Sequence, residues 1–485
     1  MTPNIHIRES SNHSSSFLLV TTFQKYKTLT GIPDSRMKDF AVKAKKEEFS
    51  GKAGETLHFE YIEGDMVKHI YVVGMGDKKT TSLQAVRTKI VEGVTLAKKL
   101  KIAEIDVYDG QSGLSVSSLT EALTIGTYAF DRFLGSEHKK KNPHIRDINI
   151  IGTGTEAEVE KGKRAAVAQL LARDLVNTPA SHMHPEIMLQ HAMEIVKKSK
   201  GTISIKVMKK SDCEALGMGA YLGVAEGSDR PSYFLVLHYK GTGKKKIALV
   251  GKSITFDSGG LSLKPSEGMM DMKIDMAGGA TVLGIFDYLS EVRPSISGFS
   301  DVYGLLPACE NMPSGKAMKP GDIVTALNGK TIEVLNTDAE GRLALADALV
   351  YAEKHLKSDY IIDLATLTGA CMVALGSDLA GLFTNDDAFE KAYRPFAEEV
   401  GDSYWRLPLQ ETYAKQMKSK IADLKNIGGG RYGGAITAAL FLKEFVEKAR
   451  WMHIDIAGPA HKDPDGATGW GVLSIIHFLE TRKDL

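Results

Sequence analysis

The segment NTDAEGRL, residues 336–343, gathers side chains that could do chemistry. It places Asp338, Glu340 and Arg342 on alternate residues, and Gly341 could turn the backbone between the last two. Carboxylates bind divalent cations, and a guanidinium binds a planar anion through two parallel hydrogen bonds. A solvated loop could have the same composition, so the interpretation depends on whether other parts of the chain supply matching groups.

A second segment, residues 251–279, is expected to form a loop that supplies Lys252, Asp257, Lys264, Asp271 and Asp275. Its Ser-Gly-Gly at 258–260 predicts a turn. A third segment, DLATLTGA at 363–370, offers threonine hydroxyls and a glycine. Each of the three segments follows an apolar stretch that reads as a strand, and this clustering is not typical of a solvated face.

Acids from several loops predict a site for two metal ions. Carboxylates can bridge a pair of hard divalent cations, and two ions about 3.5–4 Å apart lower the pKa of the water between them, which gives a hydroxide near neutral pH. The carboxylates of Asp257, Asp275, Asp338 and Glu340 carry four negative charges, which match two divalent ions. Without metal they would repel one another, and some would have to protonate.

The two lysines near these acids could have different roles. A charged lysine could stabilise an oxyanion, which contributes about 3–4 kcal/mol when the donor is preorganised. A neutral lysine could bind a metal ion, although its deprotonation at pH 7 costs about 4–5 kcal/mol. Residue type alone does not assign these two roles between Lys252 and Lys264.

The rest of the C-terminal part supplies elements that could position these groups. Six apolar stretches predict strands at 233–239, 246–251, 301–307, 331–336, 360–367 and 451–458. Helical patterns separate most of them, for example at 279–292 and 343–356. Such strands indicate a mostly parallel sheet covered on both faces, and sites in these sheets form beyond the carboxyl ends of the strands.

The N-terminal third has its own alternation of strands and helices. Strands are predicted at 16–23, 57–62, 69–76, 104–110 and 147–154, with a helix at 82–100. We therefore predict an α/β protein with a smaller N-terminal α/β domain and a larger C-terminal catalytic α/β domain, whose mostly parallel central sheet is flanked by helices. The predicted boundaries are 1–155 for the N-terminal domain, 156–182 for a connecting helix and linker, and 183–485 for the C-terminal domain.

Composition narrows the classes of function. The chain is 43% hydrophobic and 25% charged, with a formal net charge of +1, which gives no overall field to attract nucleic acid or an acidic membrane. Its three cysteines form no CxxC pair, which argues against a disulfide framework and a thiolate zinc site. The N-terminus lacks the apolar core of a signal peptide, and no run of about eighteen apolar residues could span a membrane. We expect a cytoplasmic protein with neither a membrane nor a nucleic-acid partner.

Five blocks resemble the leucyl aminopeptidase family, the M17 cytosol aminopeptidases: VGKSITFDSGGLSLKPS, MKIDMAGGA, NTDAEGRLALADAL, ATLTGA and WMHIDIAGPAH. NTDAEGRL is the signature octapeptide of this family of dinuclear-metal exopeptidases, and the blocks stand in the family's order. The match runs from about 171–179 to the C-terminus, whereas the N-terminal domain is similar only in size and α/β pattern. One departure is Ser253, where the family usually has glycine.

The resemblance implies five metal ligands, Lys252, Asp257, Asp275, Asp338 and Glu340. Lys252 is then the neutral lysine, and Lys264 is the charged one that polarises the scissile carbonyl. Arg342 would hold a bicarbonate ion that acts as general base toward the water between the metal ions, a role that suits a planar and permanently charged fork.

The implied activity is removal of the N-terminal residue, preferably leucine or another apolar residue, from peptides with a free N-terminus. The two ions per subunit would be Zn²⁺ or Mn²⁺, with Mg²⁺ and Co²⁺ as further options. The apolar pocket for the first residue would be lined by Met272, Thr366, Leu367 and Gly369, although Met272 could equally be a core residue. The resemblance also implies a homohexamer.

Several alternatives remain open at this stage. A two-metal phosphoesterase also needs clustered acids and a lysine, and a metal-dependent scaffold would have lost catalysis altogether. Arg342 could pair with a neighbouring acid instead of an anion. For His453 and Asp455 we expect a buried hydrogen-bonded pair rather than a pair of ligands. Asn336 and Asn426 are expected to brace loops.

Overall fold

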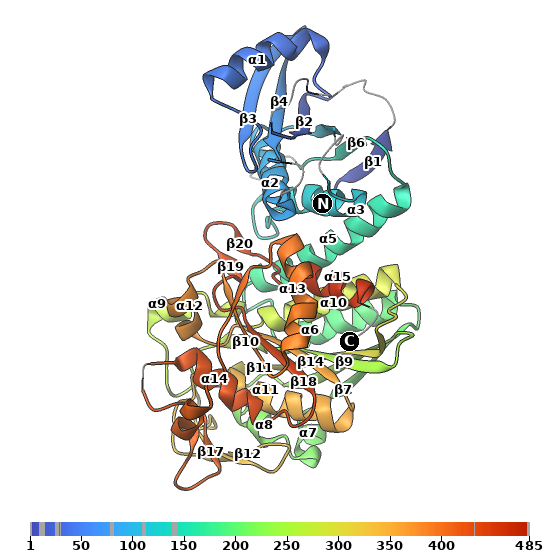
Figure 1. Ribbon diagram of the computed structural model, residues 1–485. Coiled ribbons are helices and arrows are strands. Elements are labelled where there is room, and N and C mark those ends of the chain that lie inside the picture. The colour runs from blue at the N-terminus through green and yellow to red at the C-terminus, as the bar shows by residue number, and fades with distance from the viewer. Residues whose placement is uncertain are drawn as a thin grey trace. The chain divides into compact units, whose positions relative to one another are not determined.

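The structure is a computed structural model that describes residues 2–8, 15–24, 29, 31–77, 82–108, 113–137, 144–430 and 432–482. It contains two compact units, Met1–Val167 with Glu399–Gly401, and Ala168–Glu398 with Asp402–Leu485 (Figure 1). The division falls within helix α5 (Glu156–Asn177), inside the segment expected to connect two domains. The exact domain boundaries stay a prediction.

The N-terminal unit has a six-stranded sheet. Its strands lie in the order β1 (Asn4–Arg8), β6 (Asp147–Ile151), β5 (Glu104–Tyr108), β2 (Phe17–Thr22), β4 (Met66–Gly74) and β3 (Thr56–Glu63). Neighbours are parallel except for β4 and β3. All five predicted strands are confirmed, except that residues 109 and 110 at the end of one of them lie outside the described part; β1 was not predicted.

Helices cover both faces of this sheet. Side chains of α2 (Leu83–Lys99) and α3 (Val116–Gly126) form one buried cluster with Phe17 and Leu19 of β2. Side chains of α1 (Met37–Lys46) form another with Leu18 and Val20. Because alternate residues of a strand point to opposite faces, the two clusters lie on opposite sides of the sheet. The helix predicted at 82–100 is α2, and its apolar positions are buried as expected.

The C-terminal unit contains a nine-stranded sheet. Eight strands lie in the order β16 (Tyr404–Arg406), β15 (Ala380–Thr384), β18 (Arg450–Asp455), β14 (Tyr360–Ala365), β9 (Lys245–Gly251), β11 (Phe299–Asn311), β8 (Tyr233–Lys240) and β7 (Ile203–Met208). A ninth, β10 (Ser253–Asp257), pairs with the far end of β11. The four central strands from β18 to β11 are parallel, and the antiparallel pairs lie toward the edges. This confirms the predicted mostly parallel sheet.

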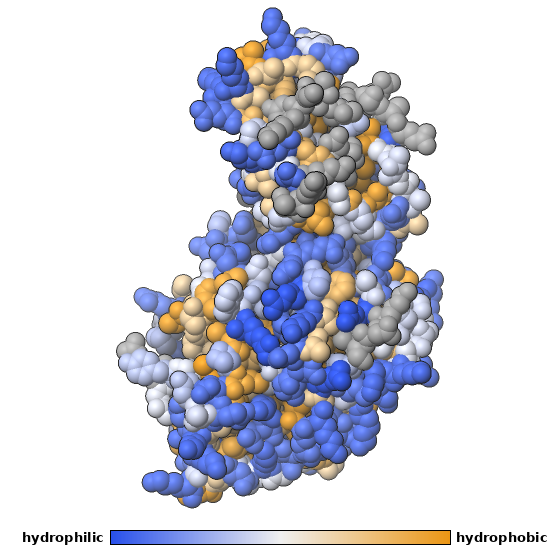
Figure 2. Space-filling model, viewed as in Figure 1, coloured by the Kyte–Doolittle hydropathy of each residue, from blue (hydrophilic) through white to orange (hydrophobic). Residues whose placement is uncertain are grey.

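Helices cover the two faces of the central strands. α11 (Gly341–Val350) packs with Ala248 and Val250 of β9 in one core cluster. α10 (Ala277–Val292) contacts β9, β11 and β14, and α6 (Pro185–Lys198) and α15 (Val472–Thr481) pack against α10. Hydrophilic residues cover much of the visible face of this unit (Figure 2), as expected when the apolar strands lie inside. In the described part of the chain, no helix combines the length and apolar character that a bilayer span requires.

Two local predictions were wrong. The strand expected at 331–336 is only β13 (Thr331–Glu333), and it belongs to a separate small sheet with β12 (Ile323–Thr325) and β17 (Leu424–Lys425) instead of the central sheet. Its pairing ends early because the backbone N–H of Leu335 donates to a side chain, that of Asn426, at 2.9 Å. Residues 251–279 are not one loop, since they contain β10, α9 (Ser266–Met269) and the 3-10 helix η2 (Met272–Ile274).

Candidate metal centre

Three carboxylates from separate elements meet at the ends of the central strands. Asp257 is the last residue of β10, Asp275 follows η2 just before α10, and Glu340 immediately precedes α11. One carboxylate oxygen from each lies within 4.8 Å of the others, and all three residues are buried. Asp257 and Asp275 are 18 positions apart, and Glu340 follows Asp275 by 65 positions, so the fold brings them to one point.

Lys252 lies at the centre of this group, between β9 and β10. Its side chain is 3% exposed, and its Nζ lies 2.8 Å from both Asp275 Oδ1 and Glu340 Oε1. It also donates a 3.0 Å hydrogen bond to the backbone carbonyl of Thr366. A Cβ on Gly341 would lie 2.4 Å from Cε of Lys252, so the glycine makes room for the lysine. This is a different reason from the turn that the sequence suggested, because Gly341 begins α11.

Lys264 contacts the other side of the acids. Its Nζ lies 2.8 Å from Asp257 Oδ2 and also forms an ion pair with Asp338. Its side chain is 15% exposed, so it is more accessible than Lys252. The two lysines therefore differ in burial and in carboxylate partners, as expected if their roles differ.

The charges of the centre are not balanced by protein groups alone. Burial raises the pKa of Asp257, Asp275 and Asp338 above the ordinary range because it removes water from the carboxylates. Burial would also lower the pKa of Lys252, but the carboxylates of Asp275 and Glu340 outweigh it and raise this pKa. Four acids thus share the charge of two lysine ammonium groups.

Two buried oxygens of the centre lack hydrogen bonds. Asp275 Oδ2 and Glu340 Oε2 have no donor within the described residues. An unsatisfied buried carboxylate oxygen is costly, and divalent cations prefer such oxygens as ligands. Together with the excess of negative charge, this donor set fits divalent metal ions.

Arg342 presents a free edge of its guanidinium. It is 8% exposed, its Nη1 donates to the carbonyl of Asn426 at 2.7 Å, and its Nε has no partner in the described structure. Burial lowers its pKa to about 10, so it stays charged at neutral pH. No carboxylate of the described residues forms an ion pair with it, which disfavours the alternative of a simple salt bridge.

Asn426 holds the octapeptide in place, as expected. Its Oδ1 accepts hydrogen bonds from the N–H groups of Leu335 and Asn336, at 2.9 and 3.3 Å, and its Nδ2 donates to the carbonyl of Asn336 at 2.6 Å. Asn336 in turn accepts from the N–H of Asp338 at 2.9 Å. The expected bracing role of both asparagines is confirmed.

Two supporting residues were not found from the sequence. Asn311, at the end of β11, donates from Nδ2 to Asp257 Oδ1 at 2.7 Å. Thr337 donates to the carbonyl of Gly259 at 2.7 Å and accepts from the N–H of Ser262 at 2.8 Å, which joins the two acid-bearing segments. Thr337 could have been identified from the sequence because it lies inside the octapeptide, whereas no motif around Asn311 indicates a role in the site.

The four residues expected to line a pocket have different environments. Thr366 is buried and donates to Asp275 Oδ1 at 2.8 Å. Leu367 is half-buried and packs against the core cluster that contains α11, while Gly369 is exposed at the start of α12 (Gly369–Leu375). Met272 is half-buried in η2 and is therefore no core residue. Their contact with a substrate stays a prediction.

The expected pairing of His453 with Asp455 was wrong. Both are fully buried, but His453 Nδ1 lies 2.5 Å from Asp363 Oδ1, and Asp455 accepts hydrogen bonds from Leu367 N at 3.1 Å and Thr368 Oγ1 at 2.7 Å. Residues two apart on a strand share a face, yet they lie about 6–7 Å apart along it, so each bonds to a neighbouring segment. Asp455 thereby anchors the loop that carries Thr366.

The chain matches known families and structures along most of its length. The model of the cytosol aminopeptidase family, catalytic domain, matches residues 170–476, and that of the N-terminal domain matches 40–137. Probable cytosol aminopeptidases of Microcystis aeruginosa and Nostoc punctiforme are 42% and 43% identical over 445 and 448 residues, which cover 89% and 90% of this chain and 89% of each relative.

Two solved structures are similar across nearly the whole fold. A mutant of tomato leucine aminopeptidase is 36% identical with a TM-score of 0.86, covering 99% of this chain and 97% of that chain. The bottromycin maturation enzyme BotP in complex with Mn is 30% identical with a TM-score of 0.83, covering 96% of this chain and 99% of that chain.

Proposed function

The chain belongs to the cytosol aminopeptidase family, and we propose that it hydrolyses the N-terminal residue from peptides with a free amino group, preferring leucine or another apolar residue. The observation that carries this proposal is the convergence of Asp257, Asp275 and Glu340 within 4.8 Å. Acids on a surface without function would be expected to stay in water, whereas here three carboxylates are buried beside two lysines.

Two divalent ions would be held by the five predicted ligands, Lys252, Asp257, Asp275, Asp338 and Glu340. Zn²⁺ and Mn²⁺ suit this set, as do Mg²⁺ and Co²⁺, and the similar BotP structure is in complex with Mn. When bound, such ions supply Lewis acidity and lower the pKa of water in the site. Lys252 would serve as an uncharged ligand, which requires that it give up its proton when the ions bind.

Two cationic side chains, those of Lys264 and Arg342, would have the other catalytic roles. Lys264, the more accessible lysine, would donate to the carbonyl oxygen of the scissile peptide and stabilise the negative charge that develops there. Arg342 would hold bicarbonate through its free donors and so place a general base beside the site. Asp257 and Asp338, which pair with Lys264, would orient its ammonium group.

Substrate selection would depend on the segments around the acids. Met272 and Leu367 are half-buried, so each offers apolar surface for the first side chain. Thr366, through its bond to Asp275, would fix the position of the loop that also carries Gly369. We extend the proposal to a homohexamer located in the cytoplasm, which light scattering and cell fractionation would test.

A direct test compares three substrates with added Mn²⁺ or Zn²⁺. Leucine p-nitroanilide should be hydrolysed, N-acetyl-leucine p-nitroanilide should not, and p-nitrophenyl phosphate should not, since the proposed reaction needs a free amine next to an amide. Turnover of the phosphate ester alone would support a two-metal phosphoesterase instead. Turnover of none of them would support a scaffold, and rapid cleavage of the acetylated amide would contradict an exopeptidase.

A further inference from the structure

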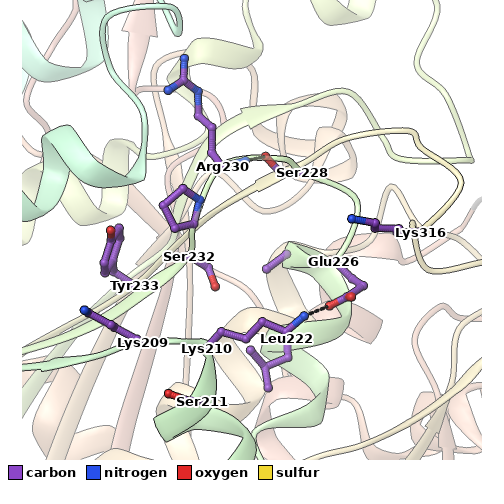
Figure 3. Close-up of a pocket in the computed structure, with 12 residues that line it drawn as sticks. Lys209, Lys210, Ser211, Leu222, Glu226, Ser228, Arg230, Ser232, Tyr233 and Lys316 are labelled. Carbon is purple, nitrogen blue, oxygen red and sulfur yellow. Dashed lines mark hydrogen bonds and ion pairs between the residues drawn. The ribbon is translucent and has the colours of Figure 1, made fainter.

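A basic pocket lies on the C-terminal unit and shares no residue with the candidate metal centre. It has a volume of about 460 Å³ and is formed by α7 (Lys210–Leu216), α8 (Gly219–Ala225), the start of β8 and the segment around Lys316 (Figure 3). This volume is within the usual range for small-molecule sites, about 300–1,000 Å³. The pocket is thus large enough for a ligand the size of a nucleotide.

The lining of this pocket is strongly positive. Four of its side chains are cationic and one is acidic, namely Lys209, Lys210, Arg230, Lys316 and Glu226. Lys210 is neutralised by Glu226 at 2.7 Å. Lys209 and Lys316 have no carboxylate within ion-pair distance among the described residues, and Arg230 has only Glu310, at 3.6 Å. At least two positive charges are therefore available to a ligand.

The positive groups are spread around the opening instead of meeting at one point. Figure 3 shows Lys209 and Lys316 on opposite sides of the pocket, with Arg230 at a third position. A single small anion could not contact all of them, whereas a chain of phosphates could reach more than one. Positive groups that are spread in this way favour a ligand with several anionic groups.

The pocket also has apolar and hydroxyl-bearing walls. Leu222, Pro231 and the half-buried Tyr233 offer surface on which a ring could pack. Ser211 is exposed and could donate its hydroxyl to a phosphate oxygen. A simple inorganic anion would leave the apolar surface unused.

We propose that this pocket binds an organic polyphosphate of nucleotide size, such as a nucleoside triphosphate. Its phosphates contact Lys209, Arg230 and Lys316, and its ring packs against Tyr233. The pocket is also connected to the metal centre through Glu310. Ser228 and Arg230 of the pocket both contact Glu310. The next residue, Asn311, donates a hydrogen bond to Asp257. A phosphate that binds Arg230 competes with Glu310 for this guanidinium.

The test is isothermal titration of the metal-loaded protein at constant ionic strength. ATP should bind at least tenfold more tightly than AMP, and adenosine should show no binding, because only a chain of phosphates can contact several of the separated cations at once. The combined variant Lys209→Gln, Arg230→Gln, Lys316→Gln should bind ATP at least tenfold more weakly, with unchanged metal content. Lys240→Gln, an exposed lysine outside the pocket, is the control and should bind normally.

A second variant should change affinity in the opposite direction. Glu310→Gln removes the charge that competes for Arg230, so ATP should bind about two- to fivefold more tightly. Unchanged ATP affinity in the triple variant would overturn the proposal, because any binding would then take place elsewhere, for example at the metal ions. Citrate binding as tightly as ATP would also overturn it. No turnover is measured, so the result is independent of the peptidase proposal.

Discussion

Lys252 and Lys264 have the same side chain but different surroundings, and this difference separates their proposed roles. Lys252 is 3% exposed and contacts Asp275 and Glu340, so it cannot approach a substrate without displacing them. Lys264 is five times more exposed and contacts Asp257 and Asp338 at the edge of the group. Only the latter position suits a cation that must touch an incoming carbonyl.

Replacing Lys264 should separate catalysis from metal binding. Lys264→Ala should keep its metal content but lose turnover of leucine p-nitroanilide by about 10²–10³-fold, because a preorganised oxyanion donor is worth that much. Metal content is measured by plasma mass spectrometry and turnover by absorbance. The matched variant Lys252→Ala should lose both turnover and bound metal. Equal loss of metal from both variants would make Lys264 a ligand.

Gly341 should tolerate no side chain, although alanine is the better helix former. A methyl group there would meet Lys252 Cε at 2.4 Å and Nζ at 2.6 Å. Gly341→Ala should therefore weaken metal binding and destabilise the protein by about 1–3 kcal/mol, as overpacking does. Urea unfolding and metal titration measure these effects. Gly315→Ala, where no atom lies within 4 Å of the new methyl, is the control and should change neither.

At the scale of elements, long apolar strands were predictable and short polar ones were not. The stretches at 246–251 and 360–367 could be recognised because burial on both faces requires continuous apolar residues. β10 and β13 are short and contain polar residues, and their pairing depends on partners far away in the sequence. The octapeptide was therefore assigned to the end of a central strand, although it follows β13 in a separate sheet.

The dependence on partners far away in the sequence also explains which parts of the site could be predicted. The five proposed ligands were named from a family resemblance, and the structure brings at least Asp257, Asp275 and Glu340 together. Asn311 was missed because its role depends on the pairing of β10 with β11, which places its amide beside Asp257. A lone asparagine at a strand end has no pattern that would reveal such a contact.

Asn426 links two elements, and its loss should loosen the octapeptide. This fully buried side chain bonds to the backbone at Leu335 and Asn336. Asn426→Ala should destabilise the protein by about 2–3 kcal/mol, because it leaves buried backbone groups without partners, and should weaken metal binding. Chemical unfolding and metal titration test this. Asn328→Ala, which removes one turn hydrogen bond, should cost at most about 1 kcal/mol and leave metal binding unchanged.

At the scale of the whole molecule, the metal ions should act as part of the folded structure. Three buried acids and the half-buried Asp338 share two lysine ammonium groups, so the metal-free fold has more acidic groups than these lysines can neutralise. Removing metal with a chelator should abolish peptidase activity and lower the melting temperature, and Mn²⁺ or Zn²⁺ should restore both. A ligand present at a hundred times its Kd stabilises the native state by about 2.7 kcal/mol, which a thermal melt resolves readily.

The matched control for metal removal is Glu340→Gln, which removes the carboxylate of one proposed metal ligand. Its melting temperature should respond little to either chelator or metal, because the ions no longer bind tightly to its native state. The dinuclear proposal would be contradicted if the unaltered protein kept its melting temperature and activity while metal analysis found less than about 0.1 ion per chain. A shift in melting temperature without recovered activity would leave the ions structural, and catalysis would then have to be assigned to other groups.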